Sequence, residues 1–132
     1  IISTKKLLRY LISKYKINLK NILGHSDIAP DRKKDPGEKF PWKELAKSKL
    51  SQWHNLSENK LKPKRLILLN LVEENIFMTN LRKIGYLKTS QQKNNIKKRN
   101  IIKAFQRHFR QNLINGISDQ ECLIISKDLL KS

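Results

Sequence analysis

A short segment, 24–37, combines residue types that could do chemistry. It reads GHSDIAPDRKKDPG and contains the imidazole of His25, the carboxylates of Asp27 and Asp35, and a run of three cations at 32–34. Imidazole nitrogen and carboxylate oxygen can both bind a metal ion. Two prolines and the flanking glycines exclude a helix or a central strand, so we expect a functional loop.

The spacing of His25 and Asp35 does not by itself establish a metal site. The two residues are ten positions apart in a loop, so only the tertiary fold can bring their side chains together. On these two residues alone, a histidine capped by a nearby carboxylate is the simpler interpretation, and a zinc site is the alternative.

Helical and strand-like patterns flank this loop. Apolar residues at helical spacing predict an amphipathic helix over 3–15, and a weak alternation over 15–22 predicts a short strand that delivers His25 at its end. After the loop, a proline opens another helical pattern, whose apolar stripe includes Trp42 and Trp53. We expect both tryptophans to pack in the core.

A second group of helices is expected beyond the polar stretch at 54–64, which is the best candidate for a domain boundary. The patterns that predict these helices cover 66–83, 101–109 and a C-terminal segment with a capping-box pattern at 118–121. Together they predict a small three-helix bundle, with His108 and Phe109 in its core.

Composition narrows the classes of function. The formal net charge of +18 would suit contact with nucleic acid or with an anionic surface such as a cell-wall polymer. Arginine, which recognises phosphates and guanine edges bidentately, is sparse beside lysine, so we expect a solvated basic surface instead. The single cysteine excludes an internal disulfide and a cysteine zinc site. No apolar run approaches the roughly 18 residues of a membrane span.

The loop string, followed by FPW at 40–42, resembles the signature of the type-2 amidase family, the zinc-dependent N-acetylmuramoyl-L-alanine amidases. The family string reads close to GHSDIAPGRKTDPG, and this chain departs from it at Asp31 and Lys34. The resemblance implies cleavage of the amide bond between N-acetylmuramic acid and L-alanine, with peptidoglycan or a muropeptide as the substrate.

The same resemblance implies roles for individual residues. His25 and Asp35 match zinc ligands, so Zn²⁺ is the expected cofactor, and Lys33 matches a lysine that stabilises the oxyanion formed as water attacks the amide. For Asp27 and Arg32 we expect bracing of the loop rather than contact with the substrate.

The second half of the chain adds a separate resemblance. IGYLKT at 84–89, AFQRHFR at 104–110 and NGISDQEC at 115–122 resemble the peptidoglycan-binding three-helix module that often follows this amidase type. Asn115 and Cys122 stand where that module usually has aspartate and threonine. The implied organisation is a C-terminal part of an amidase domain, a linker and a peptidoglycan-binding module, at 1–55, 56–64 and 65–132.

The family resemblance also implies parts that this sequence does not supply. The parent fold is α/β, and we expect this fragment to be mostly α. A third zinc ligand and an acidic general base are expected upstream of Ile1, which makes the N-terminal half of the amidase domain a partner. The chain alone is therefore expected to be inactive and to bind zinc poorly.

The expected location and two alternatives follow from the same reasoning. A wall-binding module favours the bacterial cell envelope, in the periplasm, whereas a muropeptide-recycling enzyme would be cytoplasmic. A non-catalytic cell-wall-binding protein and a basic helical nucleic-acid-binding domain are the alternative functions.

Overall fold

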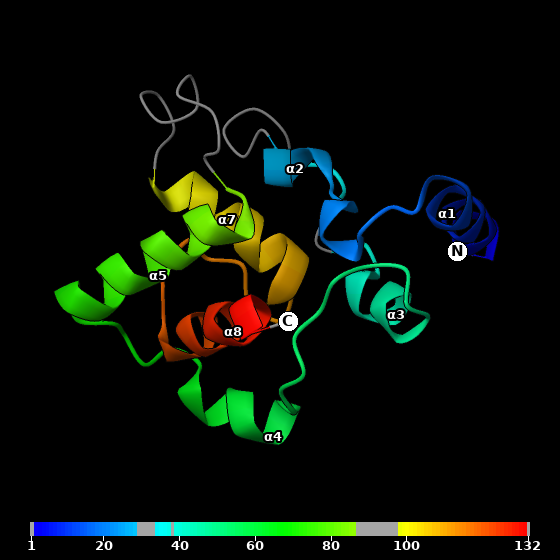
Figure 1. Ribbon diagram of the computed structural model, residues 1–132. Coiled ribbons are helices and arrows are strands. Elements are labelled where there is room, and N and C mark those ends of the chain that lie inside the picture. Colours follow the sequence, from blue (N-terminus) through cyan, green and yellow to red (C-terminus); the bar gives the residue numbers. More distant parts are fainter. Residues whose placement is uncertain (1, 29–33, 38, 87–97, 132) are drawn as a thin grey trace.

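The fold is built from helices. The computed structural model describes residues 2–28, 34–37, 39–86 and 98–131, excluding the side chains of residues 2 and 25. Within those ranges the regular elements are all helical (Figure 1), and the only β pairing is an isolated bridge between Leu68 and Asp119. The prediction of a mostly α chain is confirmed. No helix in these ranges is long and apolar enough to cross a bilayer.

The N-terminal helix forms as expected, but the strand after it does not. Helix α1 spans Ile2–Tyr15, and the 3-10 helix η1 spans Leu19–Asn21. The prediction of a strand over 15–22 is wrong, because the Asn18 side chain accepts a hydrogen bond from the Lys20 N–H and turns the chain at this point. The bond follows the known tendency of asparagine to cap turns locally.

A small apolar cluster connects α1 with the segment after the loop. Helix α3 spans Trp42–Lys47, shorter than the apolar stripe suggested, because the chain turns back after it with the Leu50 N–H bonded to the Leu45 carbonyl. The buried members of this cluster are Trp42, Leu45 and Leu50, and α1 contributes Leu8 and Ile12 at its edge.

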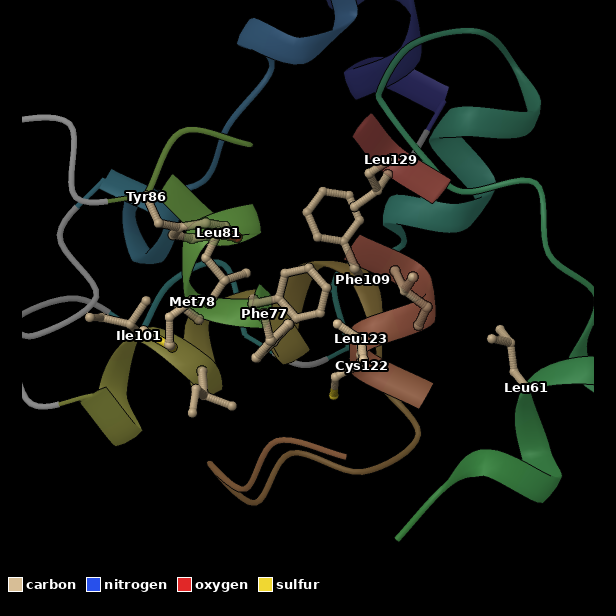
Figure 2. Close-up of a cluster of buried hydrophobic side chains, with 14 residues drawn as sticks. Leu61, Phe77, Met78, Leu81, Tyr86, Ile101, Phe109, Cys122, Leu123 and Leu129 are labelled. Atoms are coloured by element: carbon tan, nitrogen blue, oxygen red, sulfur yellow. The ribbon is translucent and has the colours of Figure 1, made fainter. Parts of the chain in front are cut away.

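The three C-terminal helices surround the main core. They are α5 (Leu71–Ile84), α7 (Lys98–Phe109) and α8 (Gln120–Lys131). Figure 2 shows side chains from all three helices meeting, among them Phe77, Phe109 and Leu123. The phenyl rings of Phe77 and Phe105 are in edge-to-face contact. The three helices pack around one core, as the apolar patterns suggested, and burial of this apolar surface is the main source of its stability. A separate peptidoglycan-binding module over 65–132 stays a prediction.

Two of these helices begin at residues that the sequence patterns did not identify. Helix α5 starts after Asn70, whose side chain forms a capping box with Glu73, rather than near residue 66. Helix α8 is capped by Asp119 and not by Ser118, because Asp119 Oδ1 accepts a hydrogen bond from the Cys122 N–H at 2.9 Å. Each cap satisfies backbone N–H groups that the helix leaves without a partner.

A buried ionic network stabilises the start of α8. The Arg110 guanidinium contacts the carboxylates of Asp119 at 2.7 Å and Glu121 at 2.8 Å, and all three side chains are nearly inaccessible to solvent. Arg65 binds the two oxygens of Glu121 from the other side, at 2.9 Å each. The network therefore joins the segment before α5 to both α7 and α8.

The polar stretch expected to be a linker is ordered against the bundle. It contains the short helices α4 (Glu58–Leu61) and η2 (Lys62–Lys64), and Leu61 is buried in the main core. Trp53 packs at the edge of both apolar clusters. The division at 56–64 stays a prediction, but the segments on either side of it are in direct contact.

Candidate functional site

The candidate site is built on α2, a single helical turn that spans His25–Ile28 at the start of the signature loop. The returning end of the loop lies against this turn, because the Ser26 N–H donates to the Asp35 carbonyl at 2.9 Å. Gly24 permits this approach, since a Cβ at that position would lie 2.2 Å from Pro36 Cδ. The two ends of the loop are therefore closed on each other.

This closure brings together the backbones of the two predicted zinc ligands. His25 begins the turn, and its neighbour Ser26 bonds to Asp35. The Asp35 side chain is exposed, whereas the His25 side chain, like Arg32 and Lys33, lies outside what the structure describes. Among the described residues, no group of three or more His, Cys, Asp or Glu side chains could hold a metal ion.

Asp27, two residues after His25, connects the loop to the C-terminal bundle. Its Oδ2 lies 2.8 Å from His108 Nδ1 on α7, and its Oδ1 accepts a hydrogen bond of 2.6 Å from the Tyr86 hydroxyl just after α5. The Gly24 N–H also donates to Oδ2, at 3.0 Å. These three contacts of the buried Asp27 carboxylate support the expectation that Asp27 braces the loop.

The electrostatics of this cluster favour an ionised Asp27. Burial opposes ionisation, but the adjacent His108 and the hydrogen bonds from His108, Tyr86 and Gly24 outweigh burial and hold the pKa of Asp27 below its usual value. Burial and the nearby Asp27 carboxylate raise the pKa of Tyr86 well above its usual value. Tyr86 is thus a neutral donor to a buried anion.

The His108 ring is also held by stacking. It lies parallel to the Trp42 ring, with centroids 3.8 Å apart, and to the Phe109 ring, with centroids 4.0 Å apart. The core positions expected for Trp42, His108 and Phe109 are confirmed, since each side chain is at most 3% exposed. One aromatic stack therefore connects the segment after the loop to α7.

Sequence reasoning did not identify the partners of Asp27. His108 was assigned to the bundle core and Asp27 to the loop, and the 81 positions between them left no pattern that could pair them. The burial expected for His108 was the one feature that could have indicated such a partner, since a buried imidazole needs a polar group to bond with.

A cavity of about 230 Å³ lies beside this cluster. Asp27, Tyr86 and His108 line it together with apolar side chains that include Leu23 and Ile28. Leu23 and Ile28 are about half exposed. The polar cluster that braces the loop thus borders a largely apolar recess.

The remaining histidine has a different environment. His54 Nδ1 accepts a hydrogen bond from the Leu56 N–H at 3.2 Å, and burial lowers the pKa of His54. Both His54 and His108 therefore make polar contacts within the folded chain.

Comparison with known proteins identifies relatives of one kind. No protein-family model matches the chain. The N-acetylmuramoyl-L-alanine amidase AmiD of Escherichia coli is 33% identical over 125 residues, which are 95% of this chain and 45% of AmiD. The 1,6-anhydro-N-acetylmuramyl-L-alanine amidase AmpD of Enterobacter cloacae is 59% identical over 32 residues, which are 24% of this chain and 17% of AmpD.

Solved structures show the same relationship. The complex of E. coli AmiD with anhydro-N-acetylmuramic acid-L-Ala-D-γ-Glu-L-Lys matches with a TM-score of 0.80 and 32% identity, covering 97% of this chain and 49% of AmiD. AmpDH3 of Pseudomonas aeruginosa matches with a TM-score of 0.76 and 28% identity, covering 97% of this chain and 50% of AmpDH3. The chain spans about half the length of these relatives.

Proposed function

Since this chain is homologous to the N-acetylmuramoyl-L-alanine amidases AmiD and AmpD, we propose that it forms part of an amidase of this type. The reaction is hydrolysis of the amide bond between N-acetylmuramic acid and L-alanine in peptidoglycan or muropeptides. The observation that carries the proposal is the match to AmiD over 95% of the chain, together with a closed loop that retains the signature residues.

The loop suits zinc in its chemistry and in its backbone geometry. An imidazole and a carboxylate are ordinary zinc ligands, and the bond between Ser26 N–H and the Asp35 carbonyl holds residues 25 and 35 at adjacent points of the backbone. We assign His25 and Asp35 as two ligands on this basis. When bound, zinc would lower the pKa of water and polarise the scissile carbonyl.

The other loop residues support this chemistry in different ways. Lys33 is assigned to stabilise the negative charge that develops on the carbonyl oxygen, as an ammonium group close to the reacting carbonyl can do. Asp27 is a positioning residue, because its bonds to Tyr86 and His108 fix the turn that carries His25.

The proposal includes parts that this chain does not supply. A third zinc ligand and the general base belong to the N-terminal half of the amidase domain, in keeping with a chain that spans 45% of AmiD. We further propose that the bundle at 65–132 binds peptidoglycan and that the enzyme acts in the cell envelope. The proposed peptidoglycan binding and the proposed location both rest on the sequence resemblance of residues 84–122 to a wall-binding module.

A chimera would test the proposed function. The N-terminal portion of E. coli AmiD that this chain does not match is fused ahead of the chain, loaded with zinc, and supplied with anhydro-N-acetylmuramic acid-L-Ala-D-γ-Glu-L-Lys. Mass spectrometry should detect the released tripeptide, and His25→Ala or Lys33→Ala should abolish or strongly reduce its release. The isolated chain should release none.

Two outcomes would contradict the proposal. A folded, zinc-loaded chimera that releases no tripeptide would overturn the assignment of amidase activity. A chimera whose activity survives His25→Ala would overturn the assignment of the ligand. Folding is checked independently by protection of buried Cys122 from alkylation, since burial raises the pKa of its thiol to about 12.

A further inference from the structure

We propose that a basic hollow beside the signature loop holds carboxylate groups of the substrate's peptide stem. The hollow has a volume of about 470 Å³ and is lined by Lys34, Gly37, Lys39, Lys103, Arg107 and Ile114. The inference deepens the proposed function and rests on it, because the stem is part of the proposed substrate.

The hollow lies between the loop and one face of α7. Lys103 and Arg107 are four residues apart and therefore lie on the same face of the helix. Lys34 lies in the returning end of the loop, and Lys39 lies two residues after the loop ends. The Gln111 side chain joins these two walls, donating to the Phe40 carbonyl at 2.7 Å and to the Arg107 carbonyl at 2.8 Å. Basic residues from the two walls therefore line one space.

The Lys103 side chain is directed by its packing. Gly116 has a φ of +73°, and a Cβ there would lie 3.2 Å from Lys103 Cγ. The aliphatic part of the Lys103 side chain therefore runs along this glycine. Lys103 is partly buried, whereas Lys34 and Lys39 are exposed. Packing restricts the aliphatic part of Lys103, so less side-chain entropy is lost when its ammonium group binds an anion.

The described lining of the hollow contains basic side chains and no carboxylate. Elsewhere, Lys5 forms an ion pair with Glu44 and Lys98 forms one with Glu74. No ion pair among the described residues involves Lys34, Lys39 or Lys103. Several ammonium groups around one concavity favour binding of an anion.

The proposed substrate supplies anions next to the reacting bond. In an L-Ala-D-γ-Glu-L-Lys stem, the γ-linkage of the glutamate leaves its α-carboxylate ionised, and the terminal lysine adds a second carboxylate. Lys34 and Gly37 flank the assigned zinc ligand Asp35 in the same loop. The hollow is therefore placed to bind the stem while the amide lies at the metal.

Titration of the isotopically labelled 132-residue chain with the tripeptide L-Ala-D-γ-Glu-L-Lys tests the inference. At physiological ionic strength, NMR shifts should change at Gly37, Lys103 and Arg107. The triple variant K34Q/K39Q/K103Q should weaken binding by about tenfold, since each contact is an exposed or partly exposed charge pair. The matched variant K47Q/K64Q/K131Q removes the same charge from other surfaces and should change binding less than twofold.

Three results would overturn the inference. Equal weakening by the two triple variants would show that binding reflects net charge alone. Equal binding of a tripeptide whose carboxylates are amidated would show that carboxylates are not recognised. Tighter binding of inorganic phosphate than of the tripeptide would show that the hollow prefers phosphate to the carboxylates of the stem. If the chimera is active but the tripeptide does not bind in the hollow, this inference alone is rejected. If the tripeptide binds in the hollow but the chimera hydrolyses no substrate, the amidase proposal alone is rejected.

Discussion

Asp27 and His108 are 81 positions apart in the sequence, yet Asp27 Oδ2 and His108 Nδ1 lie 2.8 Å apart in the folded chain. This contact connects the turn that carries His25 to the helical bundle. The bundle therefore supports the signature loop directly, whether or not it also binds the cell wall.

Replacing His108 should destabilise the whole chain. His108→Ala leaves the buried Asp27 carboxylate without its imidazole and removes the ring between Trp42 and Phe109. We expect the free energy of unfolding to fall by about 3–5 kcal/mol, because a buried carboxylate loses its partner and a cavity is left where a buried ring was packed. Urea unfolding followed by tryptophan fluorescence measures the change.

Asp128→Asn is the matched control for this prediction. Asp128 accepts a hydrogen bond from the Asn55 N–H at an exposed position, so its replacement should change stability by about 1 kcal/mol or less. A loss for His108→Ala no larger than that of the control would show that the Asp27–His108 contact contributes little.

Stability should depend on acid pH through Asp27. Its pKa in the folded chain lies below the ordinary value of 3.8, so its contribution is present above 3.8 and is lost as the pH falls through the lower folded pKa. The difference in stability between the natural chain and Asp27→Asn should be largest near neutral pH and should shrink in this acid range. Unfolding curves at several pH values measure it, and a difference that grows toward acid would contradict the lowered pKa.

Gly24 and Gly37 should respond differently to the same substitution. In Gly24→Ala the added Cβ would overlap Pro36 Cδ at 2.2 Å, which forces apart the two ends of the loop beside Asp35. We expect a loss of about 1–3 kcal/mol, as for overpacked sites, measured by thermal unfolding. Gly37→Ala meets no atom within 4 Å and should be close to neutral, so equal effects would refute the packing argument.

Zinc binding by the isolated chain should be weak and should depend on the assigned ligands. Two protein ligands bind zinc less tightly than the three of a catalytic site, and His25→Ala or Asp35→Ala leaves one. Competition with a chromophoric chelator should show measurable binding only when both residues are present. Lys33→Ala should leave the affinity unchanged, because Lys33 is assigned to the oxyanion and not to the metal.

The buried ionic network should make Arg110 essential for the bundle. Arg110→Ala leaves two inaccessible carboxylates, Asp119 and Glu121, near each other with only Arg65 beside Glu121. We expect a loss of about 3–5 kcal/mol, measured by urea unfolding. Arg65→Ala should have a smaller effect because Arg110 still contacts both carboxylates, and the opposite order would show that Arg65 is the more important partner.

Local patterns in the sequence were sufficient for much of the fold. Apolar residues at helical spacing predicted α1, α7 and the bundle, because that spacing places a continuous apolar stripe on one side of a helix. Helix ends were less predictable: Asp119 caps α8 instead of Ser118, because Asp119 also bonds Arg110 and the Leu66 N–H from distant parts of the chain. The strand predicted over 15–22 failed because strands depend on partners, whereas the Asn18 turn is local.

The candidate site divides in the same way. The sequence by itself determined the chemical types in the loop, the likeness to zinc amidases and the candidate roles of His25, Lys33 and Asp35. Only the tertiary structure decided that Asp27 bonds to Tyr86 and His108, and that Lys34 and Lys39 line the same hollow as Lys103 and Arg107. A sequence records neighbours along the chain, whereas these contacts depend on how helices far apart in the sequence pack together.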